Sequence, residues 1–202
     1  MVTLAKRVAR RLGFDLQPDE RSEIGRAKFV EEMIPKQGVG AEIGVHKGYF
    51  TPLLLEITRP QELHIIDPWY LIGEEWSWGA GNRSTIDALT RVIRHLKEPL
   101  VAGVVKLHIA DDLEILPTFP KRYFDWLYFD TSHNYEHTLN ELEISECLIK
   151  DGGVICGDDW RTDPSHPHYG VKQAVDEFCT RRPFSIVYEG ALDRQWAIRR
   201  SA

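Results

Sequence analysis

Phe124-Asp125-Trp126-Leu127-Tyr128-Phe129-Asp130 is a short apolar run that ends on a carboxylate. A second run, Gly152-Gly153-Val154-Ile155-Cys156-Gly157, ends on the acidic pair Asp158-Asp159, and a span with helical character separates the two. Short apolar runs on either side of a helix are typical of buried parallel strands. The segment from residue 124 to residue 160 therefore predicts an α/β protein.

The acidic residues after these two runs form the first candidate site. In open α/β sheets, ligands bind outside the carboxyl ends of the strands. We expect Asp130, Asp158 and Asp159 to converge at that edge, with His133 one step further along the chain. Three neighbouring carboxylates repel one another unless a cation lies among them, so the pattern predicts a cation site.

Composition limits the class of protein. The 202 residues fit one domain, and the net charge of −6 argues against a nucleic-acid partner, which would require a basic excess. An odd count of three cysteines argues against a disulfide framework. No run approaches the length of a membrane span, and the N-terminus lacks the apolar core of a secretory signal. We expect a cytoplasmic protein with no membrane partner.

The N-terminal region predicts two helices. Residues 1–13 form an amphipathic stripe with basic side chains around it, and we favour a helix packed on the domain over a basic arm or an organelle presequence. Ile24, Ala27, Val30 and Ile34 predict a second helix that ends at Pro35. We expect residues 1–38 to form a helical cap and residues 39–202 to form one globular domain.

A glycine-containing turn follows the first predicted strand, residues 39–45. Gly44 and Gly48 allow a ligand to approach the backbone near the N-terminus of the following helix. The second strand, Leu63 to Ile66, is followed by Asp67, 23 residues after Gly44. An acid at this place can accept the two ribose hydroxyls of a nucleoside.

Several later segments predict supporting structure. Residues 68–83 are an irregular aromatic loop, for which a lid or acceptor-lining role and a purely structural role are both open. Ile86, Leu89, Ile93 and Leu96 predict the buried face of a helix, and a strand over 104–109 leads to Asp111. Prolines around His166 and His168 favour an extended loop over a metal site there. The short link between strands 184–188 and 195–198 requires an antiparallel pair.

This order of elements resembles the class I S-adenosylmethionine-dependent methyltransferases. The resemblance rests on Glu42-Ile43-Gly44-Val45-His46-Lys47-Gly48, on the acids after later strands and on the final hairpin; His46 replaces the middle glycine of the usual motif. It implies an α/β fold with three layers: a Rossmann-like, seven-stranded, mostly parallel sheet with an antiparallel C-terminal hairpin. It also implies that S-adenosylmethionine contacts Glu42, Gly44, Gly48, Asp67, Asp111 and Asp130.

A narrower resemblance lies in Asp130-Thr131-Ser132-His133-Asn134-Tyr135-Glu136 together with Asp158-Asp159-Trp160. These residues are similar to the metal-dependent O-methyltransferases of small molecules, particularly those that act on sugar hydroxyls of natural products. The resemblance implies that Asp130, Asp158 and Asp159 bind Mg²⁺ and that His133 is the general base. Coordination to a hard cation would lower the pKa of an acceptor hydroxyl, and oxygen ligands suit Mg²⁺.

Other interpretations of the same residues stay open. Asp130 could contact the cofactor without a metal, and His133 could stabilise its loop. An NAD-dependent enzyme, a metal-dependent hydrolase that uses the Asp130, His133, Asp158 and Asp159 group, and a non-catalytic cofactor-binding module are the rival functions. The acceptor (sugar, phenol or lipid-linked glycan) and the oligomeric state, a homo-oligomer included, are also open.

Overall fold

The computed structural model describes residues 20–71 and 83–201. The helix predicted over residues 1–13 and most of the predicted aromatic loop, residues 72–82, lie outside the described residues. All three cysteines are free, and among them Cys156 is buried whereas Cys147 is exposed.

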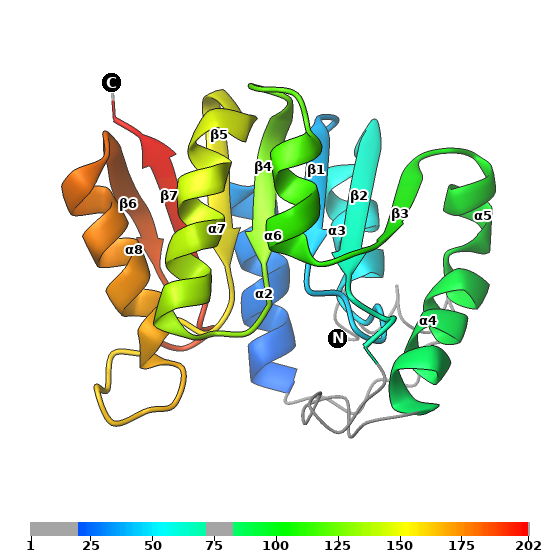
Figure 1. Cartoon of the computed structure of the whole chain (residues 1–202), viewed down its shortest axis with the longest axis horizontal. Coiled ribbons are helices and arrows are strands. Elements are labelled where there is room, and N and C mark those ends of the chain that lie inside the picture. Colours follow the sequence, from blue (N-terminus) through cyan, green and yellow to red (C-terminus); the bar gives the residue numbers. More distant parts are fainter. Residues whose placement is uncertain (1–19, 72–82, 202) are drawn as a thin grey trace.

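Strands and helices alternate through most of the described chain (Figure 1). The strands are β1 (Val39–Ile43), β2 (Glu62–Asp67), β3 (Val105–Ile109), β4 (Phe124–Phe129), β5 (Ile149–Gly157), β6 (Phe184–Glu189) and β7 (Trp196–Arg200). The helices are α2 (Glu20–Met33), α3 (Thr51–Thr58), α4 (Arg83–His95), α5 (Lys97–Val101), α6 (Asp112–Ile115), η1 (Leu116–Thr118), α7 (Tyr135–Leu148) and α8 (Tyr169–Arg181).

The seven strands form one sheet in the order β3-β2-β1-β4-β5-β7-β6. The first five strands pair in parallel, whereas β7 is antiparallel to both β5 and β6. The predicted α/β class, strand number and antiparallel hairpin are confirmed. The strand order reverses beside β1, and this is where α/β sheets bind ligands.

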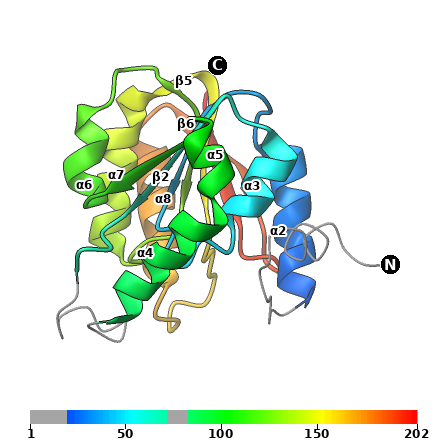
Figure 2. The same ribbon diagram turned by 90° about the vertical axis from the view of Figure 1, so that its right-hand side faces the viewer.

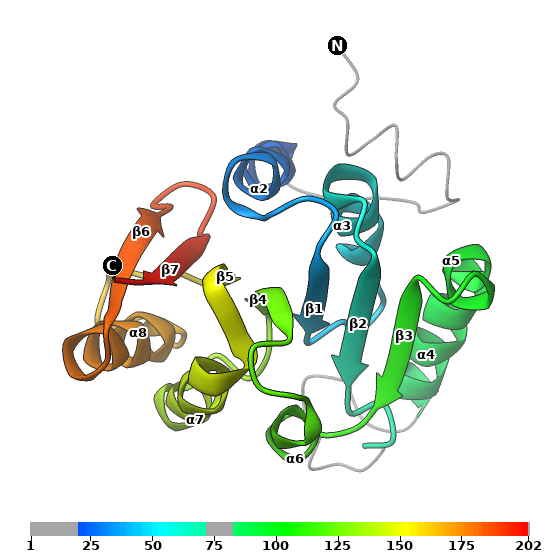
Figure 3. The same ribbon diagram turned by 90° about the horizontal axis from the view of Figure 1, so that it is seen from above.

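Helices cover both faces of the sheet (Figure 3), and the same layers are visible in the rotated view (Figure 2). Strand β4 shows why both faces need cover. Trp126 and Tyr128 pack into the core beneath α2, α3 and α4, whereas Leu127 and Phe129 pack into the core beneath α7 and α8. Successive side chains of a strand point to opposite faces, so an unbroken apolar run requires a layer on each side.

Helix α4 is present as predicted, but its buried face is only partly the predicted one. Leu96 is buried and Leu89 packs partly buried against the core, as predicted, whereas Ile86 and Ile93 are 51% and 45% exposed and Ala88 and Val92 are buried in their place. The two stripes lie side by side on the helix, and packing against the sheet selects the one that reaches the core. The face predicted for α8 is confirmed, because Val171, Ala174, Val175 and Phe178 are all buried.

Helix α2 belongs to the same core, since Phe29 and Val30 are fully buried in it. Among the helices of the described residues, none combines the length and the apolar character needed to cross a bilayer.

Candidate active site

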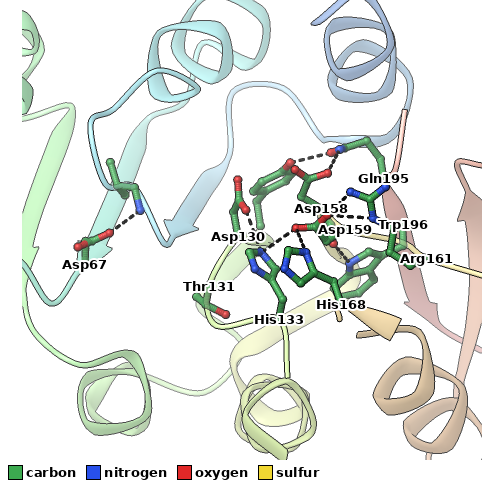
Figure 4. A network of polar contacts seen from close by, with 12 residues as sticks. Asp67, Asp130, Thr131, His133, Asp158, Asp159, Arg161, His168, Gln195 and Trp196 are labelled. Carbon is green, nitrogen blue, oxygen red and sulfur yellow. Dashed lines mark hydrogen bonds and ion pairs between the residues drawn. The ribbon is translucent and has the colours of Figure 1, made fainter. Parts of the chain in front are cut away.

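The carboxyl ends of β1, β2, β4 and β5 bring most of the predicted site residues to one edge of the sheet. Figure 4 shows Asp67 on one side of β1 and the group Asp130, Asp158 and Asp159, here called the acid cluster, on the other side. Each residue of the acid cluster offers one carboxylate oxygen, and these oxygens lie within 4.8 Å of one another. Asp158 and Asp159 are buried. The predicted convergence of the three acids is therefore present in the fold.

A cation from outside the predicted set already faces the acid cluster. Arg26 of α2 contacts the Asp158 carboxylate with its Nη2, which also lies 3.5 Å from Asp130 Oδ2. Sequence reasoning missed this residue. Its spacing could have indicated it: Arg26 lies three residues before Phe29 and four before Val30, which places it on the buried side of the helix.

His133 lies between two of the acids. Its Nε2 is 3.1 Å from Asp130 Oδ1 and 3.3 Å from Asp159 Oδ2. Its backbone is left-handed, with φ of +58°, which turns the chain sharply after β4. Burial lowers the pKa of His133, but the hydrogen bond to Asp130 and the charges of Asp130 and Asp159 outweigh burial and raise this pKa above its usual value.

Asp159 has two further partners that the sequence did not identify. Arg161 donates to Asp159 Oδ1 from Nη2 at 2.9 Å and from Nε at 3.2 Å. His168 Nδ1 lies 2.9 Å from Asp159 Oδ2, and its ring stacks on that of His133 with centroids 4.7 Å apart. The sequence predicted an extended loop around His168 and did not predict this contact. The contact forms because residues 161–168 fold back and bring the imidazole to the site.

Asp158 is held by residues of the central and C-terminal strands. Gln195 Nε2 donates to Asp158 Oδ1 at 2.7 Å, and Tyr128 donates from its hydroxyl to Gln195 Oε1 at 2.6 Å. The Trp196 indole N–H donates to the Asp158 carbonyl at 3.0 Å. These bonds fix the carboxylate at the end of β5.

The turn after β1 forms the other half of the site. Asp67 Oδ2 accepts the N–H groups of Val45 and His46 at 2.9 and 2.7 Å. His46, which replaces the usual glycine, adopts φ of +45°. The backbone therefore takes a conformation that glycine reaches at lower cost. Burial raises the pKa of Asp67 to about 6, and burial also raises the pKa of Glu42 to about 8.

Asp111 follows β3 and caps the short helix α6, because its Oδ1 accepts the N–H of Leu113 at 3.0 Å. Its predicted contact with a cofactor stays a prediction, as do the cofactor contacts of Glu42, Gly44, Gly48 and Asp130.

A family model described as a methyltransferase domain matches residues 41–160. This range runs from the glycine-containing turn to the acid cluster and is more than half of the chain. The chain belongs to this methyltransferase family. The predicted membership of the class I S-adenosylmethionine-dependent methyltransferases is thereby confirmed, and the enzyme class with it. None of the curated proteins compared matches the chain.

Solved structures of other methyltransferases share the fold. The O-methyltransferase TomG from Streptomyces achromogenes, involved in tomaymycin synthesis and solved with S-adenosylmethionine, is 17% identical, with a TM-score of 0.60 over 98% of this chain and 88% of TomG. A methyltransferase from Geobacter sulfurreducens is 14% identical, with a TM-score of 0.58 over 98% and 86%. PaMTH1 from Podospora anserina, solved with S-adenosylhomocysteine, is 16% identical, with a TM-score of 0.55 over 98% and 95%.

Proposed function

We propose that this methyltransferase transfers a methyl group from S-adenosylmethionine to a hydroxyl group of a small molecule, with Mg²⁺ at the acid cluster and His133 as the general base. The observation that carries the proposal is the convergence of three carboxylates and an imidazole beside the turn after β1. TomG, an O-methyltransferase, has the same fold. An NAD-dependent enzyme or a hydrolase would not explain the family match.

The cofactor would lie at the turn between Glu42 and Gly48. Asp67 holds two N–H groups of this turn with Oδ2, and its second oxygen would accept a ribose hydroxyl. Asp111, at the end of β3, would lie near the adenine. The methyl donor would then point toward β4, where Asp130 begins the acid cluster.

The donor set of the acid cluster fits a hard divalent cation. Three carboxylate oxygens within 4.8 Å of one another match the preference of Mg²⁺ for oxygen ligands. Asp130, Asp158 and Asp159 would hold the ion, which when bound would polarise the acceptor hydroxyl and orient it. Arg26 now supplies positive charge to two of these acids, so its guanidinium would have to yield part of that contact.

His133 would accept the proton of the acceptor. Its Nε2 already lies within hydrogen-bond distance of Asp130, one of the proposed metal ligands. In this arrangement the two acids favour the protonated ring. A positive ion among these acids would offset their charge and favour the neutral imidazole, which is the form a base requires.

The test uses labelled S-adenosylmethionine and a panel of small-molecule alcohols and phenols, together with amines and carbon acceptors, with and without EDTA. Asp158→Asn should abolish the rise in Tm that Mg²⁺ produces in the wild type. The matched control is Asp151→Asn, which changes an exposed acid near the start of the same strand. His133→Ala should keep its cofactor affinity and lose about 10²–10⁴-fold in kcat on an aliphatic hydroxyl.

Two results would reject parts of the proposal separately. Full turnover after EDTA treatment would remove the metal from the reaction. A rate for His133→Ala within threefold of the wild type on an aliphatic alcohol would remove the base. Absence of methyl transfer to any hydroxyl, together with transfer to a nitrogen or carbon acceptor, would overturn the O-methyltransferase assignment itself.

A further inference from the structure

A second group of ionisable side chains lies outside the acid cluster. Asp112 is the first residue of α6, three residues after the end of β3, whereas His137 and Glu141 lie one turn apart on α7. Asp112 and Glu141 are only 6% and 1% exposed. One ligand atom of each residue lies within 4.8 Å of the other two. Asp112, His137 and Glu141 are here called the His137 cluster.

The contacts inside the His137 cluster are specific. His137 Nε2 lies 2.8 Å from Asp112 Oδ2 and 3.5 Å from Glu141 Oε1. Thr131, next to Asp130 in the chain, donates its hydroxyl to Glu141 Oε1 at 2.7 Å. The His137 cluster and the acid cluster have no residue in common, so they share no ligand.

Glu141 contains a polar atom that these contacts do not explain. Its Oε2 is fully buried and has no hydrogen-bond partner within the part of the chain that the structure describes. A buried carboxylate oxygen without a partner is costly, because nothing replaces the water it lost. Two carboxylates buried beside one imidazole therefore hold either a shared proton or a cation between them.

We propose that the His137 cluster is a second cation site, for a divalent ion of the Zn²⁺ or Mn²⁺ class, held by one carboxylate oxygen each from Asp112 and Glu141 and by Nε2 of His137. A mixed nitrogen and oxygen donor set suits these ions better than Mg²⁺. Thr131 supplies the outer hydrogen bond that orients a ligating carboxylate.

The site has a structural consequence. Asp112 belongs to the turn after β3, and Glu141 is bonded to the loop after β4 through Thr131. An ion held by both would fasten these two segments, which flank the region proposed for the cofactor. None of its ligands belongs to the acid cluster, where the acceptor is proposed to bind, so the effect of the ion would be on stability and on loop position.

The experiment titrates chelator-treated full-length protein with Zn²⁺ and with Mn²⁺ by calorimetry and records Tm at each metal concentration. It is performed in the wild type and in an Asp159→Asn background. This change removes a ligand from the acid cluster and also from the group that Asp159 forms with His133 and His168, whose ligand atoms likewise lie within 4.8 Å of one another. Glu141→Gln and His137→Gln test the site in both backgrounds. The control is Glu143→Gln, an exposed glutamate on the same helix.

The expected result is that one metal ion binds per protein chain, and that this binding remains in Asp159→Asn and in Glu143→Gln. Glu141→Gln and His137→Gln should lower its affinity by at least about 100-fold, since loss of an outer partner alone costs 10–100-fold.

Equal affinities and Tm shifts in Glu141→Gln and Glu143→Gln would overturn the proposal. Loss of all binding in Asp159→Asn would also overturn it, and a shared proton would then be the occupant. If Glu141→Gln does not fold, His137→Gln decides by the same criteria. No cofactor or acceptor is present, so the outcome is independent of the proposed reaction.

Discussion

Asp67 shows how one side chain can serve the backbone as well as a ligand. The sequence suggests a ribose acceptor at this position. The fold adds a second role, because Oδ2 accepts two successive N–H groups of the turn after β1. This carboxylate therefore shapes the turn that the cofactor would approach.

Asp67→Ala should weaken S-adenosylmethionine binding by about 2 kcal/mol or more, about 30-fold, because it removes a ribose acceptor and leaves two N–H groups without their partner. Calorimetry measures the affinity, and Asp87→Ala, on the exposed side of α4, is the control. Equal affinities of the two variants would show that Asp67 does not take part in binding.

Gly44 and Gly152 can be compared to measure how much stability depends on the close approach of the turn after β1 to the backbone after β4. Both have positive φ, +84° and +78°, but a Cβ on Gly44 would lie 2.0 Å from the Asp130 carbonyl oxygen, whereas one on Gly152 would meet nothing within 4 Å. Gly152→Ala should cost about 1–2 kcal/mol from its left-handed backbone alone. Gly44→Ala should cost about 1–3 kcal/mol more, because the turn must move away from β4. Urea unfolding measures both, and equal losses would contradict the steric argument.

Helix α4 illustrates the limit of periodicity at the scale of the element. Its apolar residues allow two overlapping stripes, one through Ile86 and Ile93 and one through Ala88 and Val92. The sequence pattern favours the first stripe as the buried one, because its side chains are larger. In the structure the second stripe packs on the sheet, because its smaller residues let the helix approach the sheet closely.

Val92→Ala should therefore destabilise the protein by about 2 kcal/mol through a buried cavity. Ile93→Ala should change stability by less than about 0.5 kcal/mol, although it removes a larger side chain. Chemical denaturation compares the two variants directly. A larger loss for Ile93→Ala would mean that the exposed stripe is covered in solution.

The stability of the whole molecule should depend on pH in part through His64, a buried histidine that contacts the half-buried His108. His64 Nδ1 lies 2.9 Å from His108 Nε2, and its Nε2 lies 3.3 Å from the Tyr123 hydroxyl. Burial, and then the charge of His108, lowers the pKa of His64 to about 4. The unfolded chain, with an ordinary value near 6.5, therefore binds a proton at a pH where the folded protein does not.

Because the unfolded state binds more protons at His64 in this window, the contribution of His64 to stability should fall as pH falls from about 6.5 to about 4, whereas the raised pKa values of Asp67 and Glu42 act in the opposite direction. His64 alone should account for about 2 kcal/mol between pH 7 and pH 5. His64→Gln should therefore remove this loss, so that the change in stability from pH 7 to pH 5 differs between the variant and the wild type by about this amount. Urea titrations at several pH values measure the slope, and an unchanged slope in the variant would contradict this account.

The sequence by itself determined the sheet, its antiparallel end and the edge at which Asp67, Asp130, Asp158 and Asp159 lie. These features follow from local signals, because short buried runs separated by helices admit few topologies and each acid directly follows a strand. Only the tertiary structure decided which cations meet the acids. Arg26 lies 104 residues before Asp130 in the chain, and His168 reaches Asp159 through an irregular loop. Such contacts depend on how a helix packs and how a loop returns, and neither leaves a periodic signal in the sequence.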